Sequence, residues 1–142
     1  NRFRSRIATA LIGIAAAVWS VSTGHALDYA DAGSHLTIAR RLWDSTYPGF
    51  SQLGTVWLPV PHILLMPFTL SMWAWHNGAA GAALGVPCLV ASASALYRIS
   101  TRLGFTRAAR LCTVAAFVVN PSVLYIHTTA LTEPVLIAGI AA

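Results

Sequence analysis

The sequence contains no lysine and very little charge of either sign. Charged residues make up 9% of the 142 residues, whereas soluble domains carry roughly 25%. All nine basic residues are arginine, and only four residues are acidic. Hydrophobic residues make up 56% of the chain, which favours an integral membrane protein or a piece of one. The arginines stand at the ends of apolar runs, where membrane topology explains them without nucleic acid as a partner.

Several motifs with known chemistry are also missing. The sequence has no Walker loop, no GxGxxG and no GxSxG. Its two cysteines, Cys88 and Cys112, lie in apolar runs and indicate neither a disulfide framework nor a metal knuckle. We expect them not to be bonded to each other. The last residues, VLIAGIAA, stop inside an apolar run, so we expect the N-terminal part of a larger protein.

The apolar runs predict an all-α integral membrane protein, a polytopic helix bundle. Three arginines precede the first run, which is either an uncleaved first span or a signal peptide cleaved near residues 24–26. In either case the arginines stay in the cytoplasm and the following loop lies outside. Within a single module, residues 1–142, the predicted segments are a first span at about 7–23, an external loop at 24–77, a second span at 79–97, a cytoplasmic loop at 98–110, a third span at 111–126, an external loop at 127–133 and the start of a fourth span at 134–142.

The external loop is predicted to hold interfacial helices. Apolar residues at helical spacing from 31 to 44 predict an amphipathic helix, too short to cross a bilayer that needs roughly 20 residues. Residues 58–75 are apolar but contain three prolines and end in tryptophans. If this segment crossed the membrane, the next arginine cluster would lie outside, against the positive-inside rule. We therefore expect it to lie in the interface as a second surface helix.

The second and third spans carry local signals. Gly81 and Gly85 form a small-xxx-small pair that lets a neighbouring helix approach closely. Asn120-Pro121 is expected to kink the outer half of the third span. Pro134 suits the first turn of the next helix, and Thr132 is expected to cap it.

This topology places all four acids on one side of the membrane. Asp28, Asp31, Asp44 and Glu133 all fall outside, whereas the cytoplasmic side carries only arginine. Asp31 and His35 are four residues apart and share a helix face. Asp31 is either the N-cap of the helix or a general base that takes a proton from an attacking hydroxyl. Glu133 either favours the positive end of a helix dipole or serves the site.

Other side chains on the external side are candidates for substrate binding. One of Arg40 and Arg41 either snorkels to headgroups or binds the phosphate of a lipid-linked donor. Asp28 is either a solvated loop residue or part of the site. A divalent-metal site built from histidines and acids stays an alternative, although no tight ligand spacing supports it. The remaining candidates are His35, Trp57, His62 and His127.

Three stretches resemble a known superfamily. DAGSHLTIARRL (31–42), GTVWLPVPH (54–62) and NPSVLYIHTTALTEPVL (120–136) resemble the N-terminal part of GT-C glycosyltransferases. The resemblance is to the dolichyl-phosphate-mannose protein mannosyltransferase and aminoarabinose transferase group, and it covers most of residues 7–142. The family's first external acid matches Asp31, and its second matches Glu133. Ala32 stands where a second acid of the first motif is often found, which leaves open whether another carboxylate assists the base.

The resemblance implies an inverting transfer of a sugar from a polyprenyl-phosphate donor to a protein, glycan or lipid acceptor. It implies a multi-pass protein of the plasma membrane, surrounded by membrane lipid, with a cytoplasmic N-terminus and an extracytoplasmic site. Asp31 is expected to be the base and Glu133 to orient the substrates, with no cofactor. Two alternatives remain: a non-catalytic polytopic membrane subunit (for assembly or flippase-like), and a metal-dependent transferase.

Overall fold

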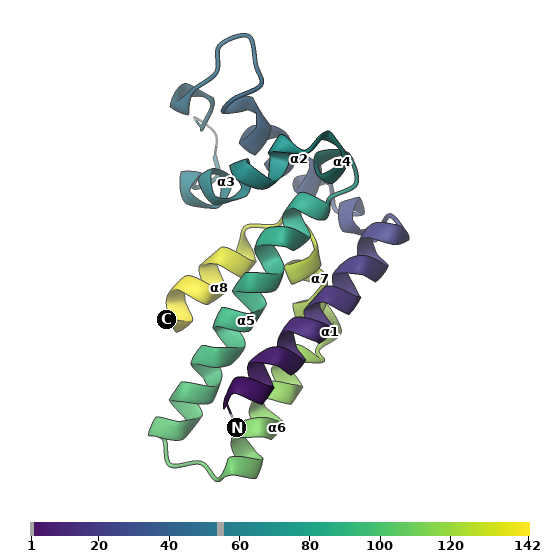
Figure 1. Cartoon of the computed structure of the whole chain (residues 1–142). Helices are drawn as coiled ribbons and strands as arrows, with labels where there is room; N and C mark the ends of the chain where they lie inside the picture. The colour runs from purple at the N-terminus through teal and green to yellow at the C-terminus, as the bar shows by residue number, and fades with distance from the viewer. Residues whose placement is uncertain (1, 54–55) are drawn as a thin grey trace.

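The chain folds into a helical bundle with a smaller helical layer across one end (Figure 1). The structure, a computed structural model, describes residues 2–53 and 56–142, and it contains only helices and turns in these ranges. The bundle consists of five helices: α1 (Arg2–Ser22), α5 (Ala79–Arg102), α6 (Arg107–Val118), α7 (Pro121–Thr128) and α8 (Glu133–Ala141). Helix α5 is central, because it packs against each of the other four.

Two helices, α1 and α5, are long and apolar enough to cross a membrane. Helices α6 and α7 make a third candidate if they are taken as one broken span, since they are bent by 59°. The bend falls at Asn120-Pro121, as predicted. Pro121 stands in the first turn of α7, and the side chain of Asn120 accepts hydrogen bonds from the backbone amides of Ser122 and Val123.

The close approach predicted for Gly81 and Gly85 is confirmed. A Cβ added at Gly81 would collide with the backbone of Ala130, and one added at Gly85 would collide with the backbone of His127. Side chains at either position would push α7 and the residues after it away from α5. Farther along α5, Arg6 of α1 donates a hydrogen bond from Nε to Ser94 Oγ at 2.9 Å.

We call α2 (Ala30–Arg41), α3 (Pro59–Leu65), η3 (Met66–Leu70) and α4 (Met72–His76) the cap. The cap lies across the end of the bundle where α5 begins, opposite the N-terminus and the α5–α6 turn (Figure 1). Short 3₁₀ turns, η1 (His25–Leu27) and η2 (Phe50–Leu53), flank α2. The arginines of α1 and those of α5 and α6 that flank the α5–α6 turn therefore gather at the end remote from the cap.

The amphipathic helix predicted at 31–44 is α2, and its apolar face is buried. Leu36 is 1% exposed and Ala39 0% exposed, and they join one core cluster with Leu65 of α3 and Ala80 of α5. Hence α2 packs onto the bundle as well as presenting a polar face outward. The helix ends at Arg41, and residues 42–49 form the turn that follows.

Several predicted boundaries were wrong. The segment 58–75 is not one surface helix but α3, η3 and α4, since Pro59 begins the first, Pro67 falls at the start of the second and Ser71 caps the third. A cytoplasmic loop was predicted at 98–110, but the loop in the structure covers only residues 103–106, because the arginines on either side belong to helices. Likewise α1 begins at Arg2, and the loop predicted at 127–133 is only 129–132.

Candidate functional site

Two buried histidines join α2 to α3 inside the cap. His35 Nδ1 lies 2.9 Å from His62 Nε2, across 27 residues of sequence. The other ring nitrogen of His62, Nδ1, lies 3.0 Å from the carbonyl oxygen of Leu58. His35 is 3% exposed and His62 1% exposed. Imidazoles this deeply buried need hydrogen-bond partners, and here each supplies one for the other.

The rings face a small cavity between the cap and the bundle, which we call the histidine cavity. His35 and His62 line it together with Pro61, with α5 at Gly81 to Gly85, and with residues 130–134. Its volume is about 10 Å³, close to the space needed for one water molecule. Trp57 makes an edge contact with His35, with the ring centroids 4.8 Å apart. Gly54 and Thr55, which begin the GTVWLPVPH stretch, lie outside the described residues.

The structure brings Asp31 and Glu133 to this same imidazole. Asp31 stands one turn before His35 on α2, and Glu133 lies between Thr132 and Pro134, two residues that line the histidine cavity. Both carboxylates act electrostatically on His35. Neither carboxylate has a hydrogen bond or an ion pair with any residue that the structure describes. Both carboxylates are therefore free to accept, and both influence the same histidine.

The alternative interpretation of Asp31 as an N-cap is wrong. Helix α2 begins at Ala30, its N-cap is Tyr29, and Asp31 stands inside the first turn. The carboxylate there benefits from the helix dipole, typically by 0.3–1 kcal/mol, but satisfies no backbone amide. Thr132 does occupy the N-cap position of α8, as predicted, but its side chain makes no capping hydrogen bond.

The environment disfavours a proton on either histidine. Burial lowers the pKa of His35 below its ordinary value, and the neighbouring His62 lowers it further. Asp31 and Glu133 oppose this effect, because their charges favour the imidazolium. Burial likewise lowers the pKa of His62, against the opposing influence of its bond to Leu58. At neutral pH both rings are neutral.

The guanidinium of Arg40 is already engaged in contacts with neighbouring residues in and beside the cap. Its guanidinium lies 4.9 Å from the ring centroid of Trp43 and 4.6 Å from that of Trp75. It also donates to Asp44 Oδ2, from Nε at 2.8 Å and from a terminal nitrogen at 2.7 Å. Arg41 next to it is exposed and has no partner among the described residues. Of the two arginines predicted to bind phosphate, Arg41 is the one whose guanidinium is free.

Asp28 and His127 stand apart from the histidine cavity. Asp28 accepts a hydrogen bond from His25 Nδ1 at 2.6 Å, and both residues are exposed. His127 is buried in α7, where Nδ1 bonds to the carbonyl of Val123 at 2.7 Å. Its ring meets the edge of Phe117 and does not line the cavity. Its Nε2 is buried without a hydrogen-bond partner among the described residues.

The arrangement offers acid–base groups rather than a metal cradle. Within residues 2–53 and 56–142, no three histidine, cysteine or acidic side chains gather as metal ligands would. Both cysteines are free thiols. What the site presents is two unpaired carboxylates beside a neutral, hydrogen-bonded imidazole pair, a set suited to accepting and passing on a proton.

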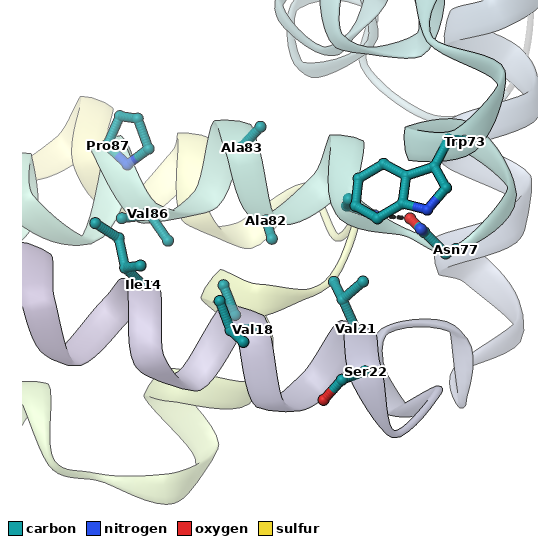
Figure 2. A pocket seen from close by; sticks show the side chains of 12 residues that line it. Ile14, Val18, Val21, Ser22, Trp73, Asn77, Ala82, Ala83, Val86 and Pro87 are labelled. Carbon is teal, nitrogen blue, oxygen red and sulfur yellow. Dashed lines mark hydrogen bonds between the residues drawn. The ribbon is translucent and has the colours of Figure 1, made fainter.

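A larger groove of about 670 Å³ runs between α1 and α5. Figure 2 shows Ile14, Val18 and Val21 of α1 facing Ala82 and Val86 of α5, with Trp73 and Asn77 at the end near the cap. The lining is almost entirely apolar. This groove offers apolar contact but none of the titratable groups that chemistry requires.

Comparison of the chain with protein-family models, with curated proteins and with solved structures found no match.

The sequence did not reveal the contact between His35 and His62. Each was a separate candidate, and nothing in the spacing of residues from two different helices predicts that their rings meet. The contribution of Thr132 and Pro134 to the same cavity was likewise missed. The signal in the sequence that could have indicated these two residues is that they stand directly before and after Glu133.

Proposed function

We propose that the chain belongs to a membrane glycosyltransferase that moves a sugar from a polyprenyl-phosphate donor to an acceptor hydroxyl or amine. The observation that carries the proposal is that Asp31 and Glu133, far apart in the sequence, both act electrostatically on His35, and that the neighbours of Glu133 line the histidine cavity. Both carboxylates lack partners among the described residues, whereas Asp28 and Asp44 are paired. The resemblance of residues 31–42 and 120–136 to GT-C enzymes supports the same assignment.

The proposal places the protein in the plasma membrane as a multi-pass protein. Helices α1 and α5 and the broken pair α6–α7 would cross the bilayer, and α8 would begin a fourth span. The arginine-rich end would face the cytoplasm and the cap would face outward, in keeping with the positive-inside rule. Two helices of sufficient length and apolar character support membrane association.

In the proposed reaction Asp31 takes the proton from the acceptor hydroxyl. The acceptor oxygen attacks the anomeric carbon in line, its bond to that carbon forms, and the bond from the carbon to the phosphate oxygen breaks. The lipid phosphate leaves with the electron pair, and the configuration inverts. Arg41 would stabilise the charge on the leaving phosphate. Glu133 would orient the sugar or the acceptor.

The size of the histidine cavity constrains how substrates reach the carboxylates. A volume of about 10 Å³ admits roughly one water and no sugar. Glu133 is exposed and Asp31 half-buried, so both can be reached from the rim of the cavity. Donor and acceptor would therefore bind over the rim, or the cap would move as active-site lids do.

The test is sugar transfer by the full-length protein in lipid vesicles that contain a polyprenyl-phosphate-linked sugar. Asp31→Asn should lower turnover by about 10²–10⁴-fold, the usual contribution of a general base. Asp44→Asn is the matched control, because Asp44 is an acid of the same region. The amide oxygen of the asparagine can still accept a hydrogen bond from Arg40, so this variant should retain turnover. Transfer by Asp31→Asn at the wild-type rate would refute the mechanism. Absence of transfer by the wild-type protein, with stability intact, would favour a non-catalytic membrane subunit.

A further inference from the structure

The end of the bundle remote from the cap carries positive charge that no acid balances. Helices α1, α5 and α6 contain no aspartate or glutamate. They contain seven of the nine arginines, at residues 2, 4, 6, 98, 102, 107 and 110. Arginine at a membrane boundary either snorkels to any headgroup or forms part of a shaped site for one. The cavity that two of these arginines line distinguishes the two cases.

This cavity, which we call the arginine pocket, has a volume of about 370 Å³. It is lined by Arg6 of α1, by residues of α5 between Pro87 and Arg98, and by Ala138 and Ala142 at the end of α8. Helices α1 and α8 both pack against α5 and lie on either side of it (Figure 1). One water molecule occupies roughly 30 Å³ in the liquid, so the arginine pocket has room for a group much larger than a small ion.

Two guanidinium groups line the arginine pocket. Arg6 donates a hydrogen bond from Nε to Ser94 Oγ at 2.9 Å, and Ser94 lines the same pocket. Arg98 donates from a terminal nitrogen to the carbonyl oxygen of Ala142 at 3.2 Å. The other N–H groups of both arginines have no partner among the described residues. Planar guanidinium groups with free N–H donors suit the oxygens of a phosphate.

The other side chains that line the arginine pocket are apolar. They include Pro87, Val90 and Ala91 of α5 and Ala138 of α8. Pro87 and Arg98 are separated by roughly 16 Å along the axis of α5, at about 1.5 Å per residue. The pocket therefore extends from charge near the end of a candidate membrane span to apolar side chains deeper along it. An anionic headgroup on a hydrocarbon chain has the same order of parts, whereas a free phosphate ion would leave the apolar lining without a partner.

We propose that the arginine pocket binds one anionic phospholipid, with its phosphate on Arg6 and Arg98 and an acyl chain along Val90 and Ala91. Basic pockets between membrane helices on the cytoplasmic side bind anionic headgroups in this way. The lack of acids in α1, α5 and α6 favours an anionic over a zwitterionic lipid, because the ammonium of the latter would have no carboxylate partner there. The inference rests on the proposed membrane placement and does not depend on sugar transfer.

The experiment titrates the purified full-length protein with phosphatidylglycerol in an uncharged detergent and counts bound lipid by native mass spectrometry. We expect one phosphatidylglycerol per chain, bound at least tenfold more tightly than phosphatidylcholine. Inorganic phosphate at the same concentration should not displace it, because the ion makes no contact with the apolar lining. Displacement by stoichiometric polyprenyl phosphate would overturn the assignment to a phospholipid.

Four variants separate the site from general charge. Arg6→Gln and Arg98→Gln should each lower the affinity for phosphatidylglycerol about tenfold or more, the usual contribution of a hydrogen bond to a charged group. Arg107→Gln is the matched control, because it removes the same charge from an exposed arginine outside the pocket, and it should keep the affinity. Ala91→Phe should weaken binding with both arginines in place, because the ring fills the apolar part of the pocket. Ala91 is exposed, so the added ring displaces no core side chain.

Unfolding temperatures measured without lipid show whether each variant is folded. Equal binding of phosphatidylglycerol and phosphatidylcholine by the wild type would overturn the proposal. An equal loss of affinity in Arg107→Gln and in the two pocket variants would also overturn it, because the arginines would then act only through net charge. A protein that transfers sugar but binds no phosphatidylglycerol would refute the lipid site alone. A protein that binds phosphatidylglycerol at the arginine pocket but transfers no sugar would refute the proposed transferase alone.

Discussion

Gly85 of α5 faces the main-chain carbonyl of His127 in α7 so closely that a Cβ has no room between them. The contact is between backbone and backbone, so no side-chain rotation can relieve it. Gly85 also lines the histidine cavity, which lies beside this packing contact. The close contact between α5 and α7 is therefore connected, through the residues after α7, to the start of α8, where Glu133 stands.

Gly85→Ala should therefore destabilise the protein. Overpacking of a close contact typically costs 1–3 kcal/mol, more than the roughly 1 kcal/mol that alanine gains over glycine in a helix. The matched control is Gly33→Ala, a helical glycine of α2 with no heavy atom near the added Cβ. It should be neutral or slightly stabilising. Unfolding of the two variants in the same detergent measures the difference, and equal stability would contradict the packing described.

Arg40→Lys should weaken the cap, whereas Arg41→Lys should not. Lysine at position 40 cannot stack its charge flat between Trp43 and Trp75, nor offer a planar fork to Asp44. We expect a loss of about 1–2 kcal/mol, the range of a partly desolvated cation–π contact. Unfolding followed by tryptophan fluorescence measures the loss, with Trp43 and Trp75 among the five tryptophans that contribute to the signal. A wild-type unfolding curve for Arg40→Lys would show that the stacking contributes nothing.

The two buried histidines should make stability depend on pH. Because the pKa of each is lowered in the folded protein, the unfolded chain binds protons at higher pH than the folded chain does. Stability is then fully present above the ordinary value of 6.5 and falls as the pH drops below it toward the folded-state pKa. The charges of Asp31 and Glu133 reduce the fall, because they favour the protonated form of His35.

Thermal unfolding between about pH 8 and pH 5 measures this dependence. His62→Gln removes one of the two groups, so its stability should fall less with acid than that of the wild type. A wild-type slope in His62→Gln would mean that the pair does not set the pH dependence.

The proposed topology predicts that Thr46 and Phe105 lie on opposite sides of the membrane. Both are exposed, the first beyond α2 and the second in the α5–α6 turn. In a background without the native cysteines, a membrane-impermeant thiol reagent should label Thr46→Cys in intact cells. It should label Phe105→Cys only after permeabilisation. Labelling of both in intact cells would overturn the topology.

The sequence predicted the helices of the bundle because their signals are local. Apolar length, the Asn120-Pro121 kink and the Gly81–Gly85 pair each act within a few residues, and the structure contains all three features. Boundaries were less accurate, because arginine belongs equally to a loop and to the last turn of a helix. The prolines of 58–75 indicated interruption without saying that three separate short helices would result.

The candidate site could be predicted only in part. Asp31 and Glu133 were identifiable, since acids in an apolar chain are few and both fall on the same side of the predicted bundle. The partners of Arg40 were not, because its two tryptophans come from α4 and from the residues after α2. The His35–His62 contact depends on how α3 packs against α2, and no spacing in a single sequence encodes that packing.

The central claim is that Asp31 and Glu133 share one site around His35, and the pKa of His35 in the folded protein tests it most directly. Titration of the labelled His35 by NMR should give a lower pKa in Asp31→Asn than in the wild type, and also a lower pKa in Glu133→Gln, because each change removes a charge that favours the imidazolium. Asp44→Asn, which neutralises an acid paired with Arg40, should leave it unchanged. A wild-type pKa for His35 in Glu133→Gln would show that the two acids do not share a site.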